Sequence, residues 1–467
     1  MLVIRGVDIR AFPSFGVNSR QKRGKCTARS VVTSALQEQG PAYLGLDFGT
    51  SGARAVCISG QRNVLHDAKV PYHRDKLSWP LTWERALHEL LEQLPLEWRQ
   101  RTAAIAVAGT TTTSLLVDRR DGSVLADPIL YNEPQGQHVV SSAEAIVPAG
   151  HSAAASVSSL CKLLSWHQRG VWQQAEERGC EAGLLHHADW MASLLHGSFT
   201  CTDWHNAARL GYNAASQAYP PCLLAQDFAR VVPQRVYEPG SPVAAVTPAI
   251  SQQWGFPPSC LICAGTTDSV AAFLAANVEK AGESVSSLGS TLAVDLLSTT
   301  PIDAARYGIC SYRWQNNWIV DGGSNTGGAV LQQFFNSEQL SLLSEQIDPQ
   351  TSSGLQYYPL LGQGQRFPIN DPNLQPHVSP RPEDDSLFLH GLLEGIARIE
   401  CEAYNLLKQL GATPVTKVHT AGGGSTSKVW TTIREGMLGV SVVASEQAEA
   451  AYGAALLALS SFDQNGS

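Results

Sequence analysis

The pattern of hydrophobic and polar positions begins with a strand, a turn and a second strand. Four of the six residues from Tyr43 to Phe48 are apolar, which predicts a buried strand. The run Gly49–Gly52 predicts a tight turn, and the apolar residues from Ala53 onward predict a returning strand, so the segment is typical of a β-hairpin. Its tip of glycine, threonine and serine exposes backbone N–H groups without bulky side chains. Such a tip suits a phosphate group.

Further along the chain, apolar residues recur at helical spacing or in short runs. The short runs predict strands at 103–108, 115–117, 261–264, 292–296 and 418–421. Helical spacing predicts helices at 83–98, 158–167, 186–195, 269–276, 329–335, 387–410, 428–438 and 446–460. The segment 239–258 is rich in proline and glycine, and we interpret it as a connector between two halves of the chain.

Three further glycine-rich segments lie at the ends of predicted strands. The run 286–291 lies between two strands and predicts a second hairpin with a tip of glycine and hydroxyl residues. The run 322–328 leads into a helix, and the run 422–425 follows a strand and precedes another helix. Glycines in such turns let a phosphate or a flat ring approach the backbone closely, because no Cβ intervenes.

Two polar strand ends are candidates for sugar binding and catalysis. Gly109 is followed by five hydroxyl residues, Thr110 to Ser114, which could line a polyol site or form a threonine-rich strand edge. Asp268 lies between a predicted strand and a predicted helix. An aspartate in that position can be a general base, or it can be the N-cap of the helix.

Length and composition restrict the class of protein. A chain of 467 residues predicts two or three domains, each with its own core. Charged residues make up 16% and hydrophobic residues 43%, as in soluble globular proteins. The net charge of −8 argues against a general nucleic-acid binder. No apolar run approaches the roughly 18 residues of a membrane helix, so we expect neither nucleic-acid nor membrane partners.

The first forty residues differ in charge from the rest. They contain seven basic residues and two acidic ones, with several serines and threonines. A basic, acid-poor leader ahead of the first strand is typical of an organelle transit peptide. A disordered basic tail or an alternative start site would also account for it. We expect residues 1–40 to be a disordered transit peptide with a plastid or mitochondrial address.

Taken together, the segments from about residue 41 to 460 resemble the FGGY carbohydrate kinase family of the actin-like, ribonuclease-H-like ATPase superfamily. The resemblance rests on five motifs in order: Asp47-x-Gly49-Thr50 with Arg54; Asp268 in Gly-Thr-Thr-Asp; Ser287 to Thr291; Ala421 to Ser425; and Glu449 with Gly453-Ala454-Ala455. It implies an α/β fold of two ribonuclease-H-like domains, each a mixed five-stranded sheet flanked by helices, with a cleft between them. The sugar-binding domain would cover residues 41–275 with the closing helix 446–460, and the nucleotide-binding domain residues 276–445.

The resemblance also implies roles for individual residues. Asp268 would be the general base, with Asp47 and Thr50 completing the catalytic group. Sugar binding would involve Asp47, Thr111, Thr267 and Asp268, and Asp47 would hold Mg²⁺. ATP binding would involve Gly49, Thr50, Ser51, Arg54, Gly289, Ser290, Thr291, Asn325, Gly328, Gly422, Gly423, Gly424 and Ser425. The implied cofactors are therefore ATP and Mg²⁺.

Two departures from the family pattern concern the sugar. Threonines follow Gly109 where pentulose and glycerol kinases usually have Gln, often with His, and the segment 131–134 replaces the usual Trp-x-Asp-x-Arg. The whole pattern most resembles the plant and cyanobacterial branch described as D-ribulose kinases, some of them named xylulose kinases. It implies phosphorylation of a ketopentose, D-ribulose or alternatively D-xylulose, and with the leader it implies a chloroplast location.

Two other classes of protein stay open at this point. A nucleotide-dependent conformational ATPase such as actin shares the implied fold without a sugar site. A kinase-like binding protein would have lost catalysis together with the usual sugar motif. The polar strand end at Thr110–Thr112 and Asp268 argue against the first class, whereas the sequence does not distinguish the second. A monomer and a dimer are equally compatible with the sequence.

Overall fold

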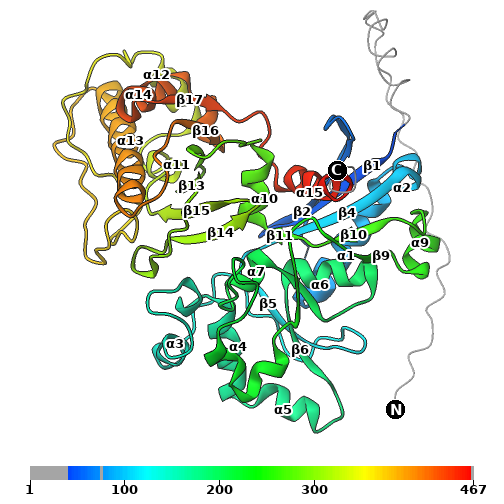
Figure 1. The fold of residues 1–467 in the computed structure, drawn as a ribbon. Helices are drawn as coiled ribbons and strands as arrows, with labels where there is room; N and C mark the ends of the chain where they lie inside the picture. The colour runs from blue at the N-terminus through cyan, green and yellow to red at the C-terminus, as the bar shows by residue number, and fades with distance from the viewer. Residues whose placement is uncertain (1–39, 74–76, 464–467) are drawn as a thin grey trace, which may run out of the picture. The chain divides into compact units, whose positions relative to one another are not determined.

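The structure is a computed structural model that describes residues 40–73 and 77–463. The expected leader, residues 1–40, lies outside the described residues except for Gly40. Two β-sheets with helices packed on them form the framework (Figure 1). The expected α/β fold with two mixed sheets is confirmed.

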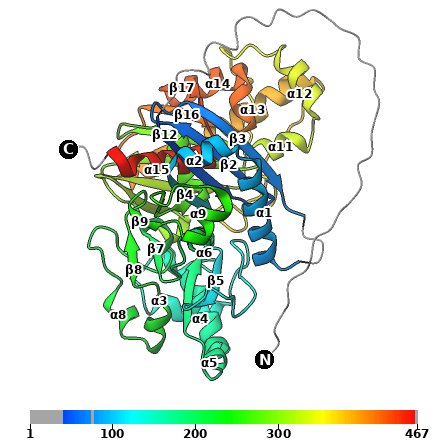
Figure 2. The same ribbon diagram turned by 90° about the vertical axis from the view of Figure 1, so that its right-hand side faces the viewer.

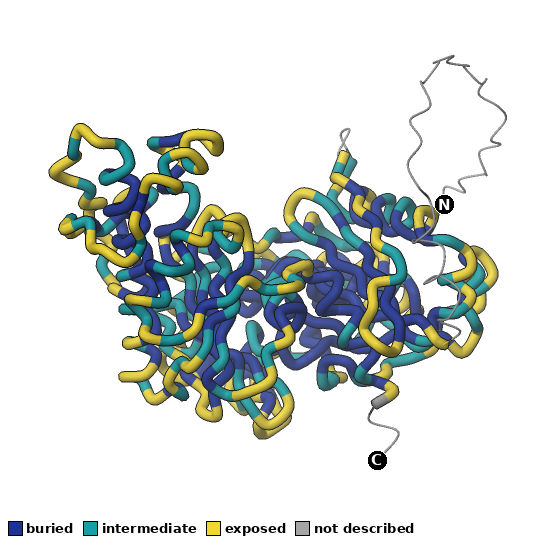
Figure 3. Tube along the Cα trace, turned by 90° about the horizontal axis from the view of Figure 1, so that it is seen from above, coloured by how far each residue is buried: buried dark blue, intermediate teal, exposed yellow. Residues whose placement is uncertain are grey.

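The first sheet has seven strands in the order β3-β2-β1-β4-β10-β9, with β11 paired to β4. Strand β1 pairs antiparallel with β2 and parallel with β4, and both β1 and β4 are buried along nearly their whole length. Buried segments gather in the interior of the molecule, with exposed segments around them (Figure 3). The strands are β1 (Ala42–Phe48), β2 (Gly52–Ser59), β3 (Val64–Pro71), β4 (Thr102–Gly109), β9 (Pro242–Ala245), β10 (Leu261–Cys263) and β11 (Thr266–Thr267).

The second sheet has six strands in the order β14-β15-β13-β12-β16-β17. It repeats the arrangement of the first sheet, because β12 pairs antiparallel with β13 and parallel with β16. The strands are β12 (Glu283–Leu288), β13 (Leu292–Ser298), β14 (Cys310–Trp314), β15 (Asn317–Ser324), β16 (Lys417–Ala421) and β17 (Ser441–Ala444).

The expectation of five strands in each sheet is wrong. Edge strands account for most of the difference, because an open edge can accept one more strand: β9 extends the first sheet and β14 the second. The interpretation of 239–258 as a connector between halves is also wrong. Strand β9 lies within it and pairs antiparallel with β10, with Pro242 opposite Cys263. Proline is tolerated there because β9 is an edge strand.

Fifteen α-helices lie in the described residues. They are α1 (Trp79–Gln93), α2 (Leu96–Arg101), α3 (Gln137–Glu144), α4 (Ser159–Gln168), α5 (Val171–Glu176), α6 (His187–His196), α7 (Trp204–Ala208), α8 (Pro221–Leu224), α9 (Pro248–Trp254), α10 (Asp268–Ala275), α11 (Gly328–Gln332), α12 (Ser337–Ser344), α13 (Asp385–Gln409), α14 (Lys428–Leu438) and α15 (Ala450–Asp463). Two small sheets join β5 (Ser114–Asp118) to β6 (Ala182–His186) and β7 (Cys201–Asp203) to β8 (Arg235–Tyr237). The 3₁₀ turns are η1 (Ser152–Ala154), η2 (Asp227–Val231), η3 (Ala305–Tyr307) and η4 (Gly423–Thr426).

Two helix boundaries differ from the expected ones for local reasons. The predicted helix 83–98 is two helices, α1 and α2, because Pro95 lacks the N–H that a continuous helix needs. The closing helix begins at Ala450 rather than at residue 446. In the described part of the chain, no helix combines the length and apolar character that crossing a membrane requires.

Helix α15 packs against strands of the first sheet although it follows the second in sequence. It lies against β1, β2, β4 and α10 (Figure 1, Figure 2). The approach is so close that a Cβ on Gly45 would lie 1.9 Å from the carbonyl oxygen of Ala451. A Cβ on Gly453 would similarly lie 1.8 Å from the carbonyl oxygen of Ala271. The small residues of α15 therefore let the end of the chain return to the N-terminal sheet.

Candidate active site

The first hairpin presents an exposed tip between β1 and β2. Thr50 and Ser51 are exposed, and the Gly49 N–H closes the turn by donating to the Gly52 carbonyl at 3.0 Å. The Ser51 carbonyl accepts from the Tyr72 N–H at 3.0 Å, which fixes the tip to the chain after β3. The N–H groups of Thr50 and Ser51 have no hydrogen-bond partner among the described residues, so they are available to a phosphate.

Asp47 lies just before this tip on the buried strand β1. The residue is 3% exposed, and its Oδ1 has no hydrogen-bond partner in the described part of the chain. Burial, and then the negative charge of Asp268, raise the pKa of Asp47 to about 7, while Arg54 opposes the shift. A buried carboxylate oxygen without a partner is unfavourable, and a bound cation would stabilise it.

The residues around Asp47 fit a magnesium site. Within residues 40–73 and 77–463, no three His, Cys, Asp or Glu side chains gather into a metal-binding group. Mg²⁺ in phosphotransferases is commonly held by one or two carboxylates together with substrate phosphates and water. The unpartnered Oδ1 of Asp47, beside a hairpin suited to phosphate, meets that requirement.

Arg54 is paired with carboxylates rather than exposed to a phosphate. Its Nη1 lies 3.6 Å from Oδ2 of Asp47, and its Nε lies 3.1 Å from Oε2 of Glu449, which precedes α15. The arginine and the glutamate are both partly exposed, so the pair adds little stability. A phosphate contact by Arg54 would therefore compete with Glu449.

Asp268, the predicted base, is held by Thr111. Its Oδ1 accepts from the Thr111 N–H at 3.2 Å, from the Thr111 hydroxyl at 2.8 Å and from the Ser269 N–H at 2.9 Å. Oδ2 has no hydrogen-bond partner among the described residues. Burial raises the pKa of Asp268, and the hydrogen bonds from Thr111 and Ser269 oppose that rise.

The N-cap of α10 is Thr267, not Asp268. The Thr267 hydroxyl accepts from the Val270 N–H at 3.4 Å, and Thr267 is fully buried. Thr267 is therefore better described as a capping residue than as the predicted sugar contact. The alternative interpretation of Asp268 as the N-cap is wrong, because the preceding residue has that place.

The threonine turn after β4 is fixed by residues that sequence reasoning missed. The Thr110 N–H donates to Nδ1 of His187 at 3.3 Å, and burial lowers the pKa of His187 to about 3, so this ring is neutral. Lys162 Nζ donates to the Thr112 carbonyl at 2.7 Å. The Thr113 hydroxyl accepts from the Tyr131 N–H at 3.0 Å. A lone histidine and a lone lysine give no motif, so only the fold reveals these contacts.

The second hairpin has its tip at Gly289, Ser290 and Thr291, all exposed. The Gly289 carbonyl accepts from the Gly328 N–H at 2.9 Å, and the Ser290 carbonyl accepts from the Ala329 N–H at 3.1 Å. The start of α11 is thus occupied by the hairpin, and these two N–H groups are not available to ATP. Gly328 instead contributes surface to the pocket described next.

A pocket of about 750 Å³ lies beside the second hairpin and the glycine turn of β16. Among the predicted residues, Gly289, Gly328, Gly423 and Gly424 line it. Its lining also includes residues that the sequence did not indicate: the apolar Leu331, Leu340, Leu389, Leu393 and Trp430, and the polar Ser337, Ser341, Ser344 and Glu345. An apolar lining with several polar groups and this volume suit an adenosine group.

The glycine turn is required by close contacts. Gly422 has φ +80°, and a Cβ there would lie 2.8 Å from the Leu288 carbonyl oxygen. Gly422 does not line the pocket, and Ser425 donates its hydroxyl to the Gly422 carbonyl at 2.7 Å. These two predicted residues therefore shape the turn, whereas their neighbours Gly423 and Gly424 face the pocket.

Asn325 has a structural contact in place of the predicted ATP contact. Its Nδ2 donates to the Gly364 carbonyl at 2.7 Å, and its N–H donates to Oε1 of Gln365 at 2.9 Å. Asn325 therefore fixes the long loop before α13, and the loop passes the end of β15.

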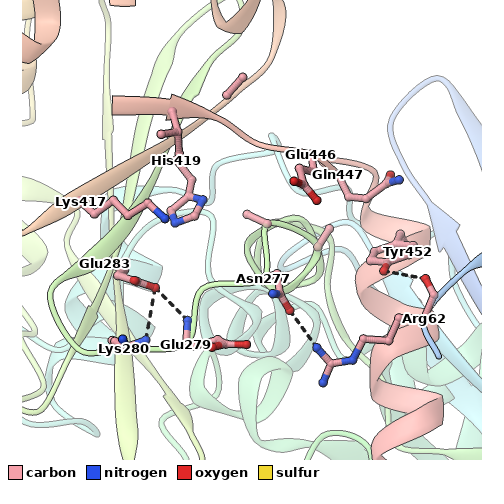
Figure 4. A pocket seen from close by; sticks show the side chains of 14 residues that line it. Arg62, Asn277, Glu279, Lys280, Glu283, Lys417, His419, Glu446, Gln447 and Tyr452 are labelled. Carbon is pink, nitrogen blue, oxygen red and sulfur yellow. Dashed lines mark hydrogen bonds between the residues drawn. The ribbon is translucent and has the colours of Figure 1, made fainter. Parts of the chain in front are cut away.

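A second hollow, of about 560 Å³, is lined by other residues (Figure 4). They include Arg62 after β2, Lys417 and His419 on β16, and Tyr452 on α15. Its positive and negative side chains are mixed, and none of the predicted site residues lines it. We therefore do not assign it to the reaction.

Comparisons with known proteins agree with this geometry. The N-terminal domain of the FGGY family of carbohydrate kinases matches residues 42–275, and its C-terminal domain matches residues 285–462. A xylulose kinase of Escherichia coli (strain K12) is 23% identical over 416 residues, covering 83% of each chain.

Solved structures show the same fold. The crystal structure of a xyloylose kinase from Brucella ovis superposes with a TM-score of 0.78 at 21% identity, covering 91% of each chain. A gluconate kinase from Lactobacillus acidophilus has a TM-score of 0.76 at 16% identity, covering 91% of this chain and 90% of the other. The chain belongs to the FGGY family of carbohydrate kinases and is an ATP-dependent sugar kinase.

Proposed function

We propose that the protein transfers the γ-phosphoryl group of MgATP to the terminal C5 hydroxyl of D-ribulose, giving D-ribulose 5-phosphate and ADP. The contact between Thr111 and Asp268 carries this proposal. Both donors of Thr111 use Oδ1 of Asp268, so Oδ2 is left to accept a proton. A base held by the polar strand end suits a polyol substrate, whereas an ATPase without a sugar site would not need it.

Asp268 acts as the general base. A sugar hydroxyl is a poor nucleophile, so its proton passes to Oδ2 of Asp268 as the new O–P bond forms and the bond to ADP breaks. The proton then leaves to solvent. Burial raises the pKa of Asp268, which makes its carboxylate a better proton acceptor than an exposed aspartate.

The phosphates lie against the two hairpin tips. Asp47 would hold Mg²⁺ through its unpartnered Oδ1, and the ion would supply positive charge to the β- and γ-phosphates. The N–H groups of Thr50 and Ser51, and those of Ser290 and Thr291 in the second tip, donate to phosphate oxygens, whereas the Gly289 N–H closes its own turn by donating to the Thr291 carbonyl at 3.2 Å. The adenosine group occupies the pocket beside Gly423 and Gly424.

D-xylulose is the second candidate substrate. The Escherichia coli relative is a xylulose kinase, which favours this sugar. D-ribulose is preferred because the threonines after Gly109 have a shorter polar reach than the Gln and His of pentulose kinases. The two sugars differ in the configuration at C3, and one hydrogen bond is worth about 0.5–1.5 kcal/mol, so discrimination should not exceed roughly tenfold.

A coupled assay of ADP release tests the proposal directly. It is run with D-ribulose, D-xylulose, L-ribulose and glycerol, each at several concentrations, and without sugar. We expect D-ribulose to give the highest kcat/KM and the control without sugar to give little ADP. A higher kcat/KM for D-xylulose would show that D-xylulose, not D-ribulose, is the substrate. ADP release without sugar at the same rate as with sugar would indicate an ATPase. If no sugar increases ADP release and the control without sugar also releases none, the protein would be a binding protein.

A further inference from the structure

Lys162 is a buried lysine whose only described side-chain partners are neutral oxygens. It lies on α4 and is 0% exposed. Its Nζ donates to the Thr112 carbonyl at 2.7 Å and lies 3.4 Å from the Thr112 hydroxyl oxygen. Burial lowers the pKa of Lys162 to about 7, and the carboxylate of Glu133 opposes that shift. Burying an ammonium without an ion pair is costly, so its contact with Thr112 calls for an explanation.

Thr112 has an unfavourable backbone conformation. Its φ is +66°, in the left-handed region that β-branched residues rarely adopt. Its carbonyl accepts from Lys162 and also from the Ser114 hydroxyl at 3.0 Å. The Nζ of Lys162 can donate to this carbonyl in either protonation state, and the bond is stronger when the amine is charged, so Lys162 is suited to hold this strained residue.

Thr111 lies directly before this strained residue. Thr111 lies between Thr110, which is bonded to His187, and Thr112, which is bonded to Lys162. The residues before and after Thr111 are therefore each held by a hydrogen bond to another part of the chain. In that arrangement the N–H and the hydroxyl of Thr111 both reach Oδ1 of Asp268.

We propose that Lys162 is a positioning residue for phosphoryl transfer, which holds Thr112 in its left-handed conformation so that Thr111 keeps Asp268 oriented. Lys162 touches neither the sugar nor the phosphates in this account and acts through Thr112 and Thr111. The proposal rests on the proposed function of Asp268 as the base.

The test compares four variants with the full-length wild type. Lys162→Met keeps the length of the side chain and removes the charge. Thr112→Gly removes the cost of a positive φ. The double variant combines both changes, and Lys280→Met, an exposed lysine of the hollow in Figure 4, is the control.

We expect Lys162→Met to lower kcat with the preferred sugar by about 10- to 100-fold while the KM for ATP stays within about twofold of the wild type. The acid limb of the kcat profile should move to higher pH, because the hydrogen bonds from Thr111 lower the pKa of Asp268. Thr112→Gly should recover a large part of the loss in the double variant, since glycine adopts the turn without help. Lys280→Met should match the wild type.

A second measurement, hydrogen exchange, does not depend on turnover. Hydrogen exchange in the segment that contains the Thr111 amide should be faster in Lys162→Met and slower again in the double variant. A wild type that turns over no sugar would overturn the proposed function, while the exchange reading would still test Lys162. Unchanged kcat and unchanged exchange in Lys162→Met would overturn the positioning role, as would equal losses of kcat in the single and double variants. If Lys162→Met fails to fold, Lys162→Gln, which keeps a neutral donor, is compared with Lys162→Gln/Thr112→Gly under the same criteria.

Discussion

Thr111 donates two hydrogen bonds to one oxygen of Asp268, from its N–H at 3.2 Å and from its hydroxyl at 2.8 Å. The two residues are 157 positions apart in sequence. They meet because β11 pairs with the end of β4, with Thr267 opposite Gly109. The threonine turn and Asp268 are therefore one structural unit, so under the proposed function a change in the turn should alter the chemistry as well as sugar binding.

Replacing Thr111 by Val should lower kcat/KM for D-ribulose by about 10- to 100-fold, because a hydrogen bond to a charged group is worth about 1.5–3 kcal/mol. Thr111→Ser keeps the hydroxyl and should stay close to the wild type. Steady-state kinetics on both variants measure the difference. Equal activity of the Val and Ser variants would show that the hydroxyl has no part in the reaction.

The raised pKa of Asp47 predicts that the stability of the protein depends on pH in the absence of metal and nucleotide. Its folded-state pKa of about 7 lies above the usual 3.8, so its contribution to stability is complete below pH 4 and is lost as pH rises to about 7. The full loss corresponds to roughly 4 kcal/mol. Asp47→Asn removes this term and should therefore gain more stability over the wild type at pH 8 than at pH 5.

Denaturant unfolding at the two pH values measures this gain. Glu92→Gln is a useful control, because Glu92 is an exposed carboxylate on α1, outside the group around Asp47. A gain for Asp47→Asn that is the same at pH 5 and pH 8 would contradict the raised pKa of Asp47.

The packing of α15 on β1 predicts unequal effects of two Gly→Ala substitutions. A Cβ on Gly45 would overlap the Ala451 carbonyl oxygen, so Gly45→Ala should lower Tm by several degrees or prevent folding. Gly436 lies in α14 with open space around its Cβ position, and Gly436→Ala should stabilise by about 0.5–1 kcal/mol. The Tm of each variant is measured by thermal unfolding. Similar changes in Tm for Gly45→Ala and Gly436→Ala would mean that α15 does not pack on β1 as described.

Removal of residues 1–39 should leave kcat and KM unchanged. The first strand begins at Ala42, and Arg101 donates to the Gly40 carbonyl, so a chain that starts at Gly40 keeps the contacts described here. Kinetic constants of the shortened and full chains measure the effect. A shortened chain that does not fold would give the leader a structural role.

Local patterns in the sequence predicted individual elements well. The helix expected at 428–438 is α14 with the same bounds, because Gly439 and the N-cap Ser427 mark its ends. Both β-hairpins with glycine and hydroxyl tips were predicted, since such residues between two apolar runs leave few alternatives. The sheet edges were not predicted, because a short strand such as β9 contains proline and has little periodicity of its own.

Contacts between segments that are distant in the chain could not be predicted from sequence patterns. Asp268 and Thr267 are adjacent and both suit an N-cap, so only the geometry shows that Thr267 caps α10 while Asp268 faces Thr111. Lys162 and His187 have no motif around them, and their roles follow from the fold of the turn. The apolar residues that line the pocket of about 750 Å³ come from several helices, which no single pattern brings together.

The most direct measurement of the central claim is the turnover of Asp268→Asn with D-ribulose and MgATP, compared with the wild type. The amide keeps the shape of the side chain and can still accept from Thr111, so the fold and Tm should be retained. Loss of a general base costs about 10²–10⁴ in rate, and kcat should fall by that factor. Turnover at the wild-type rate with an unchanged Tm would contradict the account, because Asp268 would then not be the base.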